Sequence, residues 1–331
     1  MKPINTALII VSVILVTTIA GSLYISNLSA DQTPPIVRTK TASTYGNLAS
    51  YTLTFNYTIE KTPASTPILV QTNQPISDSL AEEIAVNVFG MTHAEIIDGG
   101  IPGGTWVKDS TKLLQFYGLN TIFYAEDRLN PIVQDWDSAE IQEISDKVLD
   151  ALSDYWKFET AAGLRLVRIG PFWERTMVSE NGTITNVEVK SIGVIYRSSV
   201  NGIDIVGNGA DFSLEIAEGR VIGVELRMPI VQVTGQQTID VTPEEAVANF
   251  INGWSAAKDL GVASKTGLIP EEGECVIDSV KLVYLAKWSY NTLNEPQMPL
   301  LYKITGKLIY TDPIDGSIVT QEFTDYQYAT N

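Results

Sequence analysis

Residues 211–228, Asp-Phe-Ser-Leu-Glu-Ile-Ala-Glu-Gly-Arg-Val-Ile-Gly-Val-Glu-Leu-Arg-Met, decide the fold class. Apolar and polar residues alternate on both sides of Glu218-Gly219. Such alternation indicates strands with one buried face, and Glu-Gly is typical of the turn that joins two of them. The stretch therefore predicts a β-hairpin within an antiparallel sheet.

Further strands are predicted on both sides of this hairpin. Asn201-Gly202 predicts another hairpin, because both positions of such a two-residue turn need a positive φ. Residues 51–59, 280–288 and 302–310 also alternate between apolar and polar side chains. The chain is therefore rich in half-buried antiparallel strands.

Three stretches with helical periodicity separate the groups of strands. They are residues 78–89, residues 138–157 and a segment that follows Thr242. Thr242-Pro243 with Glu245 has the spacing of a capping box with proline in the first turn. Helix followed by antiparallel strands, three times over, predicts an α+β fold made of repeated helix-plus-antiparallel-sheet units.

This order of elements suggests a division of the chain. We expect a transmembrane anchor or signal peptide at 1–30, a linker at 31–48, an N-terminal α+β unit at 49–134, a middle unit at 135–234 and a C-terminal unit at 235–331.

The N-terminal segment carries a localisation signal. No charged residue occurs between Lys2 and Asp31, and Ala7 to Ser26 is mostly apolar. As a helix this segment would span about 30 Å, the thickness of a bilayer core. With Lys2 before it, the segment predicts a single-pass cell-membrane protein whose bulk is extracytoplasmic. A cleaved signal peptide, which would make the protein secreted, is the alternative.

Composition excludes several classes of function. The chain has 22 Lys and Arg against 39 Asp and Glu, a formal charge of −17, which argues against nucleic-acid binding. The single histidine, His93, excludes two-histidine metal motifs, and the single cysteine, Cys275, excludes a thiolate zinc cluster. No catalytic motif is present, so we predict no catalytic residue, no cofactor and no metal site. Calcium and glycan binding are left open.

One aromatic segment is the candidate contact with a partner. Pro171, Phe172 and Trp173 do not fall on an apolar stripe, unlike Trp254 in the third predicted helix. Exposed aromatic residues are typical of protein–protein contacts. We therefore predict that these three residues touch a partner protein.

The strand pattern resembles a known family. The run Val194–Gly207, followed by Leu214-Glu-Ile216 and Gly219-Arg-Val221, is similar to the hairpins of PepSY and related propeptide domains. Thr242-Pro-Glu-Glu-Ala246, with the later Ile314-Asp-Gly316, resembles the last domain of YycI/YycH-type regulators. The resemblance implies a PepSY/cystatin-like fold. It also implies a membrane-anchored extracytoplasmic protein that restrains a wall-sensing histidine kinase of Gram-positive bacteria.

Three functions remain open at this point. The first is a non-enzymatic, membrane-anchored extracytoplasmic binding or regulatory module that contacts another membrane or secreted protein. Its partner would be a sensor kinase or a protease. The second is a propeptide-like protease inhibitor. The third is a carboxylate-based glycan hydrolase, which needs two acidic residues facing one cleft.

Overall fold

The protein is described by a computed structural model. It covers residues 41–42, 45–56, 62–72, 75–98, 104–118, 121–126, 136–155, 162–178, 184–207, 210–227, 230–256, 271–286 and 297–330. The side chains of 41–42, 98, 173–178 and 184–187 also lie outside the description. Within these ranges the chain is mostly β, with 17 strands and three helices.

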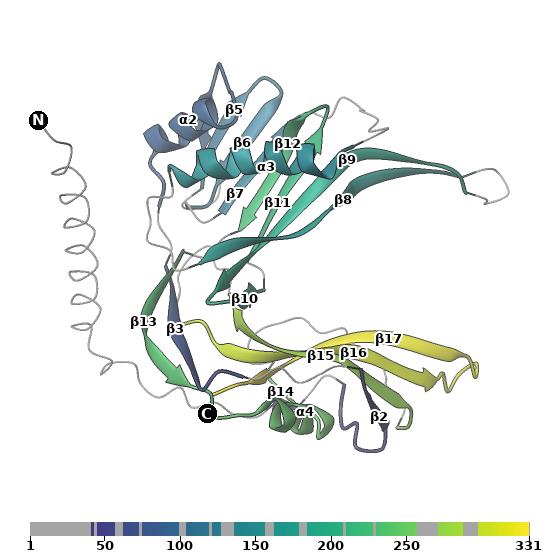
Figure 1. The fold of residues 1–331 in the computed structure, drawn as a ribbon. Helices are drawn as coiled ribbons and strands as arrows, with labels where there is room; N and C mark the ends of the chain where they lie inside the picture. The colour runs from purple at the N-terminus through teal and green to yellow at the C-terminus, as the bar shows by residue number, and fades with distance from the viewer. Residues whose placement is uncertain are drawn as a thin grey trace, which may run out of the picture.

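One mixed sheet of 13 strands dominates the structure (Figure 1). Its main path runs in the spatial order β17 (Ile318–Tyr328), β16 (Leu300–Thr311), β15 (Glu274–Leu285), β10 (Ile203–Val206), β9 (Ile184–Val200), β11 (Asp211–Ala217), β12 (Arg220–Arg227), β7 (Thr121–Glu126), β6 (Lys112–Phe116), β5 (Thr105–Asp109) and β4 (Glu95–Asp98). Beside this path, β2 (Thr52–Phe55) pairs with β15, and β8 (Gly163–Val178) pairs with β9. Two small sheets join β13 (Ile230–Thr238) to β3 (Ser65–Thr72) and β14 (Trp254–Ser255) to β1 (Thr41–Ala42).

The predicted α+β fold of repeated helix-plus-antiparallel-sheet units is wrong. Strands that we assigned to different units pair within one sheet, because β10 lies parallel to β15 and β2 also lies parallel to β15. The joint at β10 pairs Asp204 with Val283 and Val206 with Leu285. Periodicity shows which face of a strand is buried, but it does not show which strand lies beside it. The predicted domain limits are not tested and stay a prediction.

The three described helices begin close to where the sequence predicts. They are α2 (Asp78–Asn87), α3 (Ser138–Ser153) and α4 (Pro243–Ile251). The capping box at Thr242 is confirmed, since Thr242 Oγ1 accepts from the backbone N–H of Glu245 and the Glu245 carboxylate accepts from that of Thr242. The second helix is capped by the Asp137 side chain.

The helices divide the core into two parts. Helices α2 and α3 pack against one face of the half of the sheet that contains β4 to β12. Helix α4 packs against β16 and β17 at the other end, where the ring of Phe250 stacks on that of Phe323 with centroids 4.9 Å apart. Trp254, which the sequence places on the apolar side of this helix, is instead 40% exposed.

The described part of the structure does not contain the predicted membrane-spanning helix. Among the described residues, no helix is long and apolar enough to cross a bilayer. The longest of them, α3, has 16 residues and alternates between a buried and an exposed side. A span needs about 20 predominantly apolar residues. This contradicts the predicted single-pass localisation and the predicted attachment to the membrane through an N-terminal helix. The segment behind those predictions, Ala7 to Ser26, lies outside the described residues.

Candidate binding face

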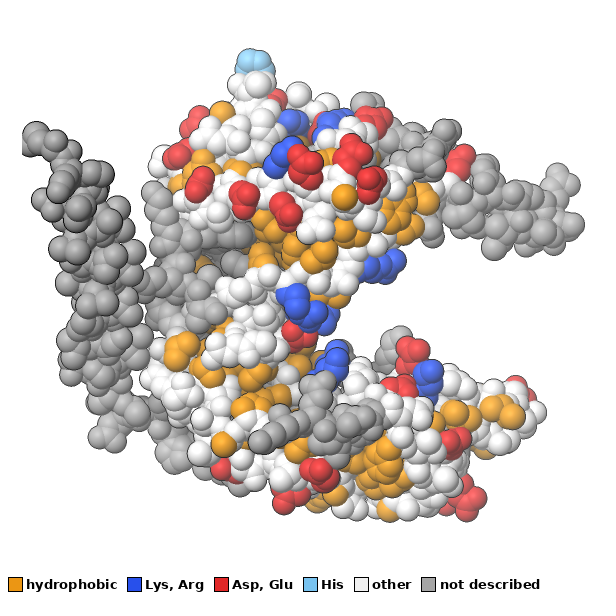
Figure 2. Space-filling model, in the orientation of Figure 1, with side chains coloured by type: hydrophobic (Ala, Val, Ile, Leu, Met, Phe, Trp, Pro, Cys, Tyr) orange, Lys and Arg blue, Asp and Glu red, His pale blue; other side chains and the backbone are white. Residues whose placement is uncertain are grey.

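The main sheet has one face against which no described helix packs. Side chains alternate between the two faces of a strand, so the residues opposite the two cores point to this second face. The sheet bends at β10, so that its two halves look toward each other across a hollow (Figures 1 and 2). We call the side of the sheet that lines the hollow the concave face. It carries Gln115, Phe123, Ser213, Glu215 and Glu225 in one half.

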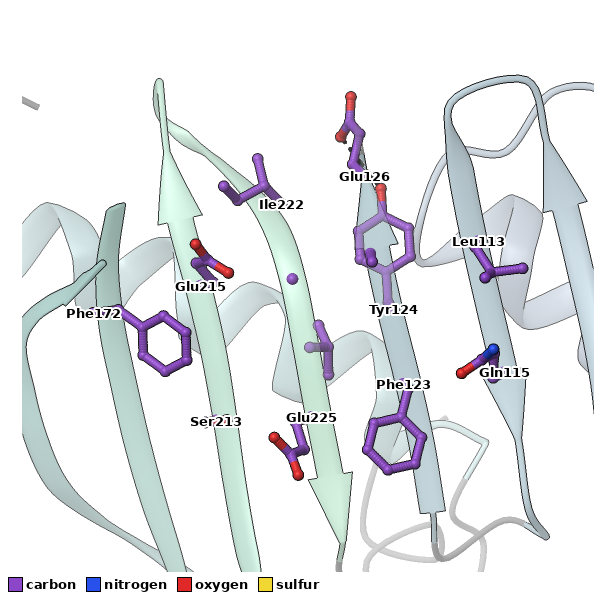
Figure 3. A pocket seen from close by; sticks show the side chains of 13 residues that line it. Leu113, Gln115, Phe123, Tyr124, Glu126, Phe172, Ser213, Glu215, Ile222 and Glu225 are labelled. Atoms are coloured by element: carbon purple, nitrogen blue, oxygen red, sulfur yellow. Dashed lines mark hydrogen bonds between the residues drawn. The ribbon is translucent and has the colours of Figure 1, made fainter. Parts of the chain in front are cut away.

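A pocket of about 270 Å³ lies on the concave face between β8 and β6. Figure 3 shows the aromatic and acidic side chains that surround it. Its lining residues are Leu113, Gln115, Phe123, Tyr124, Ala125, Glu126, Phe172, Ser213, Glu215, Ile222, Gly223, Val224 and Glu225. A pocket that combines aromatic rings with a few oriented polar groups is the usual form of a binding site.

Phe172 forms one wall of this pocket and is 50% exposed. It is the extra residue at a β-bulge between Pro171 and Trp173, opposite Ile192 and Ser191. The ring lies over Gly193 of β9, where a Cβ would come within 2.8 Å of Phe172 Cδ2. Glycine at this position therefore lets a large ring lie flat against the sheet while one side stays open to solvent.

The three residues of the predicted partner contact lie together in β8. Pro171 is half-buried, Phe172 is exposed, and the side chain of Trp173 lies outside the description. Their contact with a partner is not tested and stays a prediction. The structure adds to it that Phe172 faces a pocket, which the sequence does not show.

Three glutamates border the pocket, and each has a partner. Glu126 forms an ion pair with Arg220 and accepts from the Tyr124 hydroxyl at 3.3 Å. Glu225 pairs with Arg227 at 2.5 Å. Glu215 is 6% exposed and accepts from Ser191 Oγ at 2.6 Å. Burial and the nearby Glu126 raise the pKa of Tyr124 above its usual range.

Comparisons with known proteins identify no family. No protein-family model matches the chain, and no curated protein matches it. Among solved structures, the chain is similar to an uncharacterized protein from Eubacterium rectale at 9% sequence identity. That alignment covers 85% of this chain and 89% of the other, with a TM-score of 0.49. A likeness of this size carries no argument about function, and the resemblance to PepSY and YycI/YycH-type proteins is not tested by it.

Other residues that the sequence singles out lie away from the pocket. Cys275 is fully buried in β15, and burial raises the pKa of its thiol to about 11, so it behaves as an apolar residue. Within the described ranges, no three His, Cys, Asp or Glu side chains are placed to hold a metal ion. Glu274, next to Cys275 in the same strand, accepts from Thr54 Oγ1 at 2.8 Å.

The polar residues that line the pocket were not predicted from the sequence. Ser213, Glu215 and Glu225 are the polar members of the same alternation that predicts the hairpin of 211–228. The signal was therefore present, since alternation places these side chains together on the face opposite the core. The contact between Gly193 and Phe172 could not be predicted from the sequence, because it depends on the bulge in the neighbouring strand.

Proposed function

We propose that this protein is a non-enzymatic binding module that holds a segment of a partner protein on the concave face. The observation that carries the proposal is Phe172, a half-exposed ring that lies on Gly193 at the edge of the pocket. Aromatic rings that pack on the protein with one side and are exposed to solvent on the other are typical anchors of protein–protein contacts.

The edge of the sheet is a less suitable binding surface than its face. Among the described strands, β8 pairs only with β9, so its outer edge is open. This edge contains Pro171 and several register shifts, including those next to Arg168 and Trp173. Proline and bulges disfavour the addition of another strand. A partner segment therefore finds better support across the concave face than along this edge.

The resemblance to PepSY and YycI/YycH-type proteins supports a regulatory role for the contact. It makes a sensor kinase or a protease the first partner to test, and inhibition of a protease is the alternative form of the same binding. The glutamates around the pocket would suit the third alternative, a glycan hydrolase. All three already accept hydrogen bonds or pair with arginines, so we favour binding over hydrolysis.

Photo-cross-linking at Phe172 tests the proposal. Phe172 is replaced by p-benzoylphenylalanine in the full chain, and the same replacement at Val86 serves as the control. Val86 is 46% exposed on α2, on the other side of the sheet. We expect one protein to cross-link at position 172 and not at 86. The purified protein should then bind the wild type about tenfold more tightly than Phe172→Ala, and equally well to Val86→Ala.

Two results would contradict the proposal. One is a cross-linking pattern at position 172 that does not differ from that at position 86. The other is cleavage of a glycan by the wild type that is lost in Glu215→Gln, because Glu215 faces the pocket and such a loss would favour the hydrolase.

A further inference from the structure

Five basic residues gather on the concave face where the sheet bends. They are Arg165 and Arg168 on β8, Arg197 on β9, Lys281 on β15 and Lys303 on β16. Arg165 lies opposite Arg197, and Lys281 lies opposite Lys303. We call these five residues the bend cluster. Figure 2 shows Lys and Arg side chains on the inner walls of the hollow.

Strand β10 brings the two pairs together. It forms a hairpin with β9 and lies parallel to β15, so it connects the two halves of the sheet. Its Asp204 accepts from Arg165 Nη2 with both carboxylate oxygens, at 2.9 and 3.0 Å, and lies 3.9 Å from Arg197. Lys303 is close enough to Arg197 and Asp204 for both to affect its ionisation.

The bend cluster has more positive than negative charge. Two carboxylates, those of Asp204 and Asp211, lie against it, and Arg197 Nε is 3.7 Å from Asp211. In the part of the chain that the structure describes, Arg168, Lys281 and Lys303 form no ion pair. This excess of positive charge occurs in a chain whose formal charge is −17. A positive region within an acidic protein attracts anionic groups that the rest of the surface repels.

Two further observations indicate that the positive charges of the bend cluster are incompletely compensated. Arg197 Nε is buried and makes no hydrogen bond with any described residue. Burial, followed by the charge of Arg197, lowers the pKa of Lys303. A partly buried group of cations that repel one another is stabilised when an anion binds between them.

We propose that the bend cluster binds the carboxylates of an acidic, extended peptide segment, whose apolar residue packs on Phe172. This inference rests on the proposed function and names the chemistry of the partner. Phe172, Arg168 and Arg165 all lie on the concave side of β8. Arg165 pairs with Arg197 and Phe172 lies over Gly193, so four residues of β9, about 14 Å, separate the two side chains. A matching extended peptide places its acidic residues from about four residues beyond its apolar one.

The geometry favours a peptide over other anions. The site combines a ring with spaced cations along one strand, and a polypeptide offers apolar and acidic side chains at that spacing. Arg165 already holds the carboxylate of Asp204 with both oxygens, which is the contact that an acidic side chain of the ligand would reproduce. An anionic polysaccharide or a polyphosphate would use the cations but gain nothing from Phe172.

A binding assay with two matched peptides tests the proposal on the full chain. One fluorescein-labelled peptide of about ten residues carries phenylalanine at one end and glutamates in its far half. The second has glutamine in place of each glutamate. We expect the glutamate peptide to bind about tenfold more tightly at about 20 mM NaCl, and this preference to shrink at about 200 mM as screening increases.

Substitutions test whether the bend cluster causes the preference for the glutamate peptide. Arg168 and Lys281 are exposed, so Arg168→Gln with Lys281→Gln should leave the thermal unfolding unchanged. This double variant should lose most of the preference for the glutamate peptide. The control Lys147→Gln lowers the charge on α3, where Lys147 pairs with Glu143, and should keep the preference.

Each other outcome overturns the inference. Equal binding of the two peptides, or a preference that survives in the double variant, removes the acidic segment as the ligand. Tighter binding of polyphosphate or of an anionic polysaccharide than of the glutamate peptide assigns the cluster to a different ligand. Cross-linking at Phe172 tests the proposed function separately, so a partner captured there without a preference for glutamate would refute this inference alone.

Discussion

Asp325 gives the most quantitative prediction. It lies in β17 with 0% of its side chain exposed, and it accepts hydrogen bonds from Ser255 Oγ and from Gln327 Nε2. Burial raises the pKa of this carboxyl from 3.8 to about 6, although both hydrogen bonds lower it. The folded protein therefore keeps a carboxylate at neutral pH where burial disfavours the charge.

The size of this effect follows from the difference between the two pKa values. Between 3.8 and about 6 the folded protein holds the proton of Asp325 more tightly than the unfolded chain does. The free energy of unfolding therefore falls as the pH rises through this window. At about 1.4 kcal/mol for each pH unit, the fall amounts to about 3 kcal/mol.

Urea titrations of the wild type and of Asp325→Asn measure this contribution. Asparagine does not titrate, so the variant gains about 3 kcal/mol relative to the wild type between about pH 3 and about pH 7.5. The repulsion within a chain of charge −17 is nearly the same in both proteins and cancels in the difference. Loss of the bond to Gln327 lowers the stability of the variant equally at every pH.

A second variant checks the cause. Ser255→Ala removes a hydrogen bond that lowers the pKa of Asp325, so its stability should fall further than that of the wild type as the pH rises. The reasoning is refuted if the difference between the wild type and Asp325→Asn changes by less than about 0.5 kcal/mol over the whole range.

Three further predictions concern the core and the helix start. Phe250→Ala removes a fully buried ring that stacks on Phe323, and chemical denaturation should show a loss of about 3–5 kcal/mol; a loss below about 1 kcal/mol would contradict this packing. Thr242→Ala removes the acceptor for the Glu245 N–H and should cost about 1 kcal/mol, whereas an unchanged midpoint would argue against the cap. Cys275 should resist alkylation at about pH 8 in the folded protein and react after unfolding, because burial raises its thiol pKa to about 11; rapid native alkylation would refute its burial.

Local features of the fold can be predicted from the sequence because they depend on neighbouring residues. Asn201 and Gly202 have φ values of 51° and 80°, as the hairpin requires. The capping box at Thr242 is present as well. The start of α2 shows that such a pattern can indicate the wrong N-cap residue. Ser79 and Glu82 have the spacing of a capping box, but Ser77 is the residue whose side chain accepts from the Leu80 N–H.

Pairing between distant strands could not be predicted in the same way. The contact of Asp204 with Val283 joins residues far apart in the sequence, and it runs parallel where the local hairpins run antiparallel. Alternation is identical for a strand in either arrangement. The expectation of separate repeated units follows from considering only neighbouring strands, and β10 is the element that makes it wrong.

At the candidate site, simple alternation gives the wrong face for some side chains of β8, because the strand contains register shifts. Counted by twos along β8, Arg165 and Arg168 fall on opposite faces. The register shift between Leu166 and Arg168 moves the later residues by one position, so both arginines lie on the concave face. After this shift, plain alternation also places Phe172, four residues beyond Arg168, on the concave face. Bulges carry no reliable mark in a single sequence, and the net charge of −17 hides a local excess of cations. The register of β8 therefore adds Arg168 to the cations that a partner meets, and only the three-dimensional pairing reveals this register.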